Sequence, residues 1–154
     1  TASTPSPFNG PTRKVRKLLM ERTNNPNSSV DERVNRTRRI FSEIGYQGID
    51  LNTDEFYNDI SSSIERGGKD DTGFGRQLTA ILGSENRLDK VKAIKAQTLI
   101  IHGKEDPLIR VKNAYKTKKL IDNSKLIIIS DMRHLIEIPV FDQFKNELLK
   151  HLNS

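Results

Sequence analysis

The sequence predicts an α/β protein in which a helical segment is followed by a β-α-β-α unit with two parallel strands. Through the first half of the chain, apolar residues recur every three to four positions, the period of an amphipathic helix. After Leu88 the pattern changes to two short, β-branched apolar runs, TLIIH from Thr98 and KLIIIS from Lys125. Such continuous runs are typical of strands covered on both faces. We therefore expect a helical segment over residues 1–88 and a mixed core unit over residues 89–154.

Four helices are expected in the first segment. They are predicted over residues 12–22, 29–45, 52–67 and 71–83. Ser29 and Glu32 have the spacing of a capping box, in which each side chain accepts a hydrogen bond from the other residue's backbone N–H. Asn52 and Glu55 repeat that spacing before the third helix. Residues 1–10, rich in Pro, Ser and Thr, predict an extended lead-in to the first helix.

Two further helices are expected in the second segment. Between the apolar runs, Val111, Ala114 and Tyr115 fall on one helical face, and Pro139 opens the last helix. Two strands joined through a helix are expected to be parallel, with a right-handed crossover. The sequence predicts no third strand, so an edge of this sheet is left for something else to cover. The sheet is therefore expected to be incomplete.

Composition narrows the classes of function. The chain has 26 Lys and Arg against 20 Asp and Glu, but the basic residues are scattered and lack the aromatic residues of a nucleic-acid platform. The absence of cysteine excludes a disulfide framework and a cysteine nucleophile. No apolar segment is long enough to cross a bilayer, and the N-terminus has no signal-peptide core. We expect a cytoplasmic protein with no nucleic acid, membrane, cofactor or metal as partner.

Two residues whose side chains could take part in catalysis follow the two predicted strands. Asp106 comes a few residues after the first strand, and His134 comes a similar distance after the second. Adjacent parallel strands bring such loops together at their carboxyl ends, where reactive groups collect in open α/β sheets. Asp106 is then placed to bond one imidazole nitrogen of His134, leaving the other as a general base. His102, at the end of the first strand, is expected to be structural.

The stretches around these residues resemble the C-terminal part of the α/β-hydrolase fold. QTLIIHGKEDPLI is similar to the penultimate strand and its acid loop, and KLIIISDMRHLIEIP to the last strand and its histidine loop. RQLTAILGSENRLDKVKAIKAQTLIIHG resembles the passage from a helical cap into that strand, as in the aclacinomycin-methylesterase-like members. The resemblance implies that residues 1–88 are a cap and that Asp106 and His134 are the acid and histidine of a Ser-Asp-His triad acting on an ester.

The sequence departs from this family in two ways. Asp131, Met132 and Arg133 stand before the histidine, where family members usually carry small residues, often glycine. The nucleophile motif G-x-S-x-G, which precedes the cap in the family, occurs nowhere in the chain, and Gly83-Ser84-Glu85 is only a near miss. We therefore expect the C-terminal portion of a carboxylic ester hydrolase, a fragment or one subunit of a split enzyme, inactive alone.

Two partners are consistent with that expectation. One is the N-terminal half of the hydrolase, and the other is a second copy of the chain, joined through the open sheet edge. The alternative function is a non-catalytic interaction module that keeps the hydrolase scaffold and binds another chain.

Overall fold

The computed structural model describes residues 10–21, 27–67, 72–84 and 87–153, and these residues form two compact units. The sheet unit contains residues 87–153 together with 10–11 and the segment Ile44–Tyr46. The helical unit contains the described residues of Thr12–Glu43 and Gln47–Ser84. The sequence did not anticipate that Ile44–Tyr46 belongs with the sheet unit, and the division at residue 88 stays a prediction.

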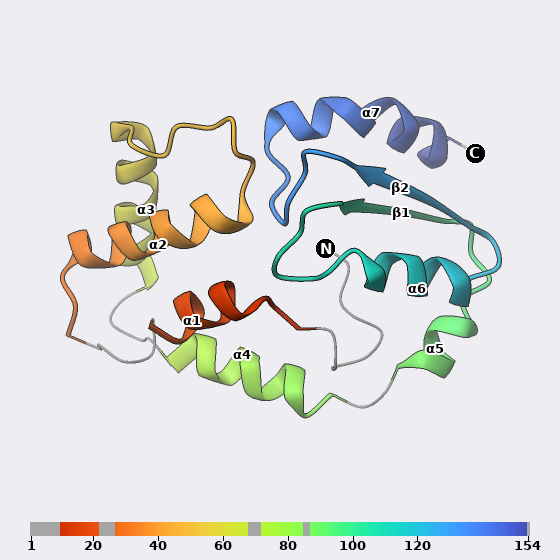
Figure 1. Ribbon diagram of the computed structural model, residues 1–154, viewed down its shortest axis with the longest axis horizontal. Helices are drawn as coiled ribbons and strands as arrows, with labels where there is room; N and C mark the ends of the chain where they lie inside the picture. Colours follow the sequence, from red (N-terminus) through yellow and green to blue (C-terminus); the bar gives the residue numbers. More distant parts are fainter. Residues whose placement is uncertain (1–9, 22–26, 68–71, 85–86, 154) are drawn as a thin grey trace. The chain divides into compact units, whose positions relative to one another are not determined.

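The sheet unit has the predicted β-α-β-α order. Its parallel strands, β1 (Thr98–Gly103) and β2 (Ser124–Ile129), pair in register from Thr98 opposite Ser124 to Gly103 opposite Ile129. Helix α6 (Lys112–Leu120) connects the strands, and α7 (Ile138–Leu152) follows β2. Figure 1 shows both strands lying between α6 and α7. A short helix before β1, α5 (Leu88–Lys92), was not predicted from the sequence.

The core of the sheet unit lies between the sheet and α7. Side chains of β2, of the loop after it and of α7 form this cluster, with partly buried residues around them: Ile129, Met132, Val140 and Phe144, then Tyr46, Ile101, Ile127 and Leu148. On the other face of the sheet, Ile100, Ala114 and Ile121 are buried. Helices on both faces explain why the strands lack the period-two alternation of a half-solvated sheet.

The helical unit contains the four helices that the sequence predicts. They are α1 (Arg13–Glu21), α2 (Val30–Ile44), α3 (Asp54–Gly67) and α4 (Thr72–Leu82). The first capping box is confirmed, because Ser29 N–H donates to Glu32 Oε2 at 2.8 Å and Glu32 N–H donates to Ser29 Oγ at 3.2 Å. Val15 and Val34 are buried, and the rings of Phe41 and Phe56 meet edge to face at 5.8 Å.

The second predicted capping box is wrong by one residue. Thr53, not Asn52, caps α3, because its Oγ1 accepts the N–H of Phe56 at 3.2 Å and its carbonyl accepts the N–H of Tyr57. The N–H of Asn52 donates instead to the Asp50 side chain at 2.8 Å, an Asx-type turn that moves the start of the helix.

Parts of three sequence predictions lie outside the described residues: residues 1–9 of the predicted lead-in, the end of the first helix at residue 22 and the start of the fourth helix at residue 71. Within the described ranges, none of the helices combines the length and the apolarity that a membrane span requires.

Candidate active site

The loop after β1 holds a buried carboxylate by its own backbone. Asp106 Oδ1 accepts the N–H groups of Leu108 and Ile109, both at 2.8 Å. These bonds close the turn that follows Asp106 and satisfy one carboxylate oxygen. The Asp106 side chain is 3% exposed. The orientation of the carboxylate is therefore set by main-chain donors, and Oδ2 is left to accept from another group.

The loop after β2 crosses the end of β1 at very close range. A Cβ added at Gly103 would lie 2.2 Å from the carbonyl oxygen of Arg133 and 2.3 Å from that of Met132, so only glycine fits there. Met132 itself is buried in the α7 core cluster, which anchors the loop in that position. Gly103 and Met132 thus bring His134 beside the acid loop. Sequence reasoning did not single out either of them as a site residue, although a glycine at the end of a buried strand was a usable signal.

The structure brings the two predicted site residues together. His134 Nδ1 lies 2.9 Å from Asp106 Oδ2, and the His134 side chain is 16% exposed. An ionised carboxylate can only accept a hydrogen bond, so Nδ1 carries the proton and donates a hydrogen bond to Asp106. The other ring nitrogen, Nε2, then has a lone pair that can take a proton from a hydroxyl. The pair is an oriented imidazole on a buried carboxylate.

His102 lies close to Asp106 and His134 but is not hydrogen-bonded to Asp106. Its ring is 4% exposed, and Nε2 lies 2.8 Å from the carbonyl oxygen of Ile109. The distance from His102 Nε2 to Asp106 Oδ2 is 3.8 Å, too long for a hydrogen bond. Because the Ile109 carbonyl can only accept, Nε2 carries the proton, and His102 ties the end of the acid loop to β1.

Asp131, one of the unusual residues before His134, is bonded to α7. Asp131 Oδ2 accepts a hydrogen bond from Gln143 Nε2 of α7 at 3.0 Å, so the Asp131 carboxylate is tied to α7. The backbone N–H groups of His134 and Leu135 both donate to the carbonyl of Ile44, at 2.7 and 3.2 Å. The histidine loop is therefore held from two sides.

The near-miss serine is not placed as a nucleophile. Ser84 follows α4 in the helical unit, and its hydroxyl donates to the carbonyl of Ala80 at 2.7 Å. A nucleophile elbow instead connects a strand to a helix and exposes its serine. Among the described residues there is also no group of three or more His, Cys, Asp or Glu side chains that could hold a metal ion.

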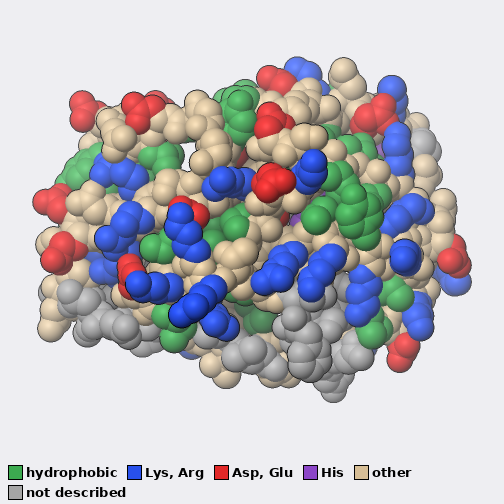
Figure 2. All heavy atoms as spheres, viewed as in Figure 1, with side chains coloured by type: hydrophobic (Ala, Val, Ile, Leu, Met, Phe, Trp, Pro, Cys, Tyr) green, Lys and Arg blue, Asp and Glu red, His purple; other side chains and the backbone are tan. Residues whose placement is uncertain are grey.

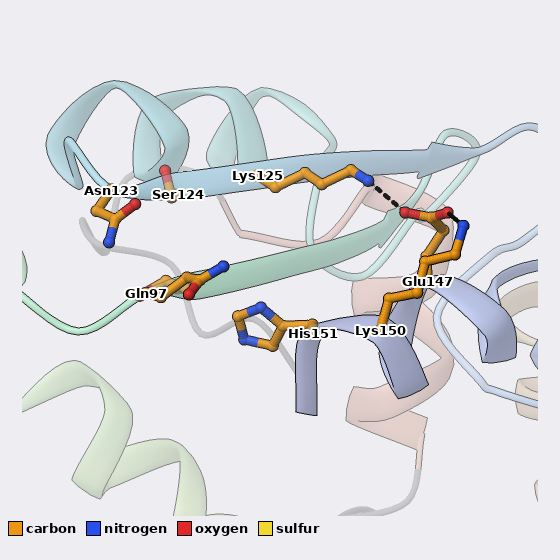
Figure 3. Close-up of a pocket in the computed structure, with 8 residues that line it drawn as sticks. Gln97, Asn123, Ser124, Lys125, Glu147, Lys150 and His151 are labelled. Atoms are coloured by element: carbon orange, nitrogen blue, oxygen red, sulfur yellow. Dashed lines mark hydrogen bonds and ion pairs between the residues drawn. The ribbon is translucent and has the colours of Figure 1, made fainter. Parts of the chain in front are cut away.

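A hollow of about 340 Å³ lies at the opposite, amino end of the two strands (Figure 3). Two lysines, a glutamate, a histidine, two amides and two hydroxyls line it: Gln97, Thr98, Asn123, Ser124, Lys125, Glu147, Lys150 and His151. Glu147 forms ion pairs with both Lys125 and Lys150, and these hydrogen bonds lower the pKa of Glu147 to about 2. The carboxylate of Glu147 is thus shared by two ammonium groups in this hollow.

The described fold has known counterparts among solved structures. A scan against protein-family models finds no match, and neither does a search of curated proteins. The structures that it resembles include an esterase from Exiguobacterium antarcticum, with a TM-score of 0.66 and 17% identity over 92% of this chain. A meta-cleavage product hydrolase from Pseudomonas fluorescens matches 78% of this chain, with a TM-score of 0.62 and 24% identity. A bromoperoxidase from Bacillus anthracis matches 91%, with a TM-score of 0.64 and 21% identity.

These likenesses concern the fold. The chain has the architecture of the C-terminal part of an α/β-hydrolase, with helices preceding a parallel two-stranded sheet. It covers 48%, 45% and 48% of the three structures named above, so it spans about half their length. The three proteins are an esterase, a meta-cleavage product hydrolase and a bromoperoxidase, and a shared fold does not choose among their activities.

Proposed function

We propose that this chain supplies the acid, Asp106, and the base, His134, of a Ser-Asp-His triad in a carboxylic ester hydrolase. The serine would come from residues outside this sequence, which contains no G-x-S-x-G. The observation that carries the proposal is the 2.9 Å contact between a backbone-held, buried carboxylate and an imidazole at the carboxyl ends of adjacent parallel strands.

In the proposed reaction, His134 Nε2 removes the proton of the serine hydroxyl as its oxygen attacks the ester carbonyl. The resulting imidazolium is stabilised by Asp106 and returns the proton to the departing alcohol. Water then enters by the same path: His134 takes a proton from it, the hydroxide attacks the acyl-serine, and the proton goes back to the serine. Asp106 stays ionised throughout and keeps the ring in the required tautomer.

Ester hydrolysis is preferred over other reactions on two grounds. The stretch RQLTAILGSENRLDKVKAIKAQTLIIHG, which leads into the first strand, resembles the methyl-ester-hydrolysing, aclacinomycin-methylesterase-like members of the fold. One of the structures with a similar fold is an esterase. The substrate is proposed to be a small-molecule ester, with a pocket shaped partly by the residues that supply the serine.

The exposure of the strands supports the need for further residues that cover the sheet. Each strand contains a continuous apolar run, yet five apolar residues of the two strands together stay partly exposed: Leu99, Ile101, Leu126, Ile127 and Ile128. Figure 2 shows hydrophobic side chains on the visible surface over β1 and β2. In the described part of the chain, each strand pairs along one edge only. We propose that the partner is the N-terminal half of the hydrolase, which places a further parallel strand against β1.

The open edge also favours the second candidate, a non-catalytic interaction module. That module would need the same edge but no Asp106–His134 pair. The two functions therefore differ in what happens when the imidazole is removed from an assembled complex.

The test is complementation with a polypeptide that carries the elbow serine, from the coding sequence upstream of this chain. The 154-residue chain alone is expected not to hydrolyse short aryl esters, and the assembled pair is expected to do so. His134→Ala should then abolish most turnover, while His151→Ala, at the far end of α7, should leave it unchanged. A complex that hydrolyses esters equally well with His134→Ala would contradict the assignment, as would covalent labelling of a serine in the isolated chain by a fluorophosphonate.

A further inference from the structure

The segment Ile44–Tyr46 is bonded to the histidine loop at three points. The carbonyl of Ile44 accepts the N–H groups of His134 and Leu135, at 2.7 and 3.2 Å. The N–H of Tyr46 donates to Glu137 Oε1 at 3.0 Å. Ile44 and Gly45 are buried, and the Tyr46 ring packs against the core cluster beneath α7. We call Ile44–Tyr46 and its three hydrogen bonds the 44–46 clamp.

Glu137 belongs to this clamp rather than to the helix it precedes. It is the residue before α7, and its carbonyl accepts the N–H groups of Val140 and Phe141 as the helix begins. At that position a short polar side chain usually caps the free N–H groups of the first turn. The Glu137 side chain makes no such bond and reaches instead to Tyr46, 91 residues earlier in the chain.

The position of the Glu137 side chain costs free energy. Glu137 Oε2 is buried and has no hydrogen-bond partner among the described residues. A buried carboxylate oxygen without a donor costs free energy that the same oxygen would not lose in water. The side chain is therefore held by its single bond to Tyr46 and by the packing around it.

We infer that the 44–46 clamp positions the general base, with Glu137 as a positioning residue for His134. His134 lies on a loop outside any helix or strand, so its ring direction depends on where its own backbone is held. The bond from His134 N–H to the Ile44 carbonyl holds the backbone at the histidine itself. The bond from Tyr46 N–H to Glu137 Oε1 ties the side chain three residues further on to the same segment. A catalytic side chain must keep its geometry within a fraction of an ångström, and supporting bonds of this kind provide that precision.

This inference rests on the proposed role of His134 as base, and it adds residues that the family resemblance did not suggest. It predicts that the oxygen acceptor at residue 137 affects the orientation of the His134 ring. No described hydrogen bond joins Glu137 to Asp106, so this effect would pass through the backbone of the histidine loop. The charge of Glu137 should matter less than its reach, because a backbone N–H needs only an oxygen at the correct distance.

Two substitutions in the full 154-residue chain separate reach from charge. Glu137→Gln keeps an oxygen at the same reach and removes the charge, whereas Glu137→Asp keeps the charge and shortens the side chain by one methylene. NMR would measure hydrogen exchange at the backbone amides of Tyr46, His134 and Leu135, and the nitrogen shifts of the His134 ring, which identify the protonated nitrogen.

Glu137→Gln is expected to match the wild-type chain in both measurements. Glu137→Asp is expected to speed exchange at the three clamp amides by about tenfold or more and to reduce the share of His134 rings with the proton on Nδ1. Amides within β1 and β2 should keep their wild-type exchange rates.

Three results would overturn the inference. Faster exchange at Tyr46 with an unchanged His134 ring would mean that the clamp does not position the base. A uniform rise in exchange across β1 and β2 would mean that Glu137 only stabilises the sheet unit. If Glu137→Gln behaved like Glu137→Asp, the charge and not the acceptor would be responsible. A wild-type ring protonated on Nε2 would be a different failure, because it would contradict the Asp106–His134 pair and with it the proposed function.

Discussion

The two ends of the same two-stranded sheet each hold a carboxylate, and they hold it in opposite ways. At the carboxyl end, the Asp106 side chain is 3% exposed and accepts two main-chain hydrogen bonds and one from His134. At the amino end, the Glu147 side chain is 34% exposed and is bonded to Lys125 and Lys150, whose side chains are 63% and 74% exposed. Backbone donors cannot move away, whereas lysine side chains on flexible stems can. Of these two carboxylates, that of Asp106 is the one held in a fixed orientation by main-chain donors.

The largest effect is expected for Asp106→Asn in the complex assembled with the serine-bearing polypeptide. Asparagine can still accept the bonds from Leu108 and Ile109, but its NH₂ group would face His134 Nδ1 and favour the wrong tautomer. In a serine protease the same change lowers kcat about 10⁴-fold, and we expect a loss of that order here. Steady-state kinetics with an aryl ester measures it.

Asp131→Asn is the matched control for this measurement. Asp131 is also an acid beside the histidine loop, but its carboxylate bonds Gln143. Turnover should stay within about twofold of the unmodified complex, since a group bonded elsewhere on the surface contributes little to the imidazole. Equal losses in the two variants would show that general charge near the loop matters more than the Asp106 contact.

The next effect in size is expected for Gly103→Ala, which tests how closely the two loops must approach. The added Cβ would lie within 2.3 Å of two carbonyl oxygens of the histidine loop, so the loop has to move away from β1. We expect a loss of about 3 kcal/mol in the free energy of unfolding, at the upper end for an overpacked site. Urea denaturation of the 154-residue chain would measure it.

Gly75→Ala provides the comparison, because a Cβ at that position in α4 has nothing within 4 Å. Alanine is the better helix former, so this variant should be as stable as the wild-type chain or slightly more stable. If Gly103→Ala left the stability equally unchanged, this would contradict the close approach of the histidine loop to Gly103.

The smallest effect is expected at the other end of the sheet, for Glu147→Gln. Hydrogen bonds from Lys125 and then Lys150 lower the pKa of Glu147 from 4.5 to about 2 in the folded chain. A carboxyl whose folded pKa is depressed adds stability above its unfolded pKa and loses that contribution as the pH falls toward its folded pKa. The wild-type chain should therefore be slightly more stable than the variant at pH 6, and this margin should shrink between pH 4.5 and pH 2.

The exposure of both lysines keeps that margin small and makes it sensitive to salt. Denaturation at several pH values, at low and at high salt, would measure the difference between wild type and variant. A margin that does not change with pH would show that the ion pairs of Glu147 contribute nothing to folding stability.

Local signals in the sequence were enough to predict most of the elements. The capping box of Ser29 and Glu32 marks the start of α2, and Pro139 lies in the first turn of α7. The β-branched runs correspond to β1 and β2 within one residue. These signals work because caps, proline and side-chain periodicity act over a few neighbouring residues. Where two local signals competed, as at Asn52 and Thr53, the choice between them could not be made from the sequence.

By itself the sequence determined the fold class and placed Asp106 and His134 after two parallel strands, because strand order and crossover direction follow from short-range rules. Tertiary structure alone decided the details of the site. It placed the backbone of Met132 and Arg133 against Gly103, gave Asp131 a partner on α7, and brought Ile44–Tyr46 to the histidine loop. These contacts join residues up to 91 positions apart, and their energies depend on burial and on distances of a few tenths of an ångström. No pattern of neighbouring residues encodes such distances, so the sequence could name the proposed acid and base but not the long-range contacts around them.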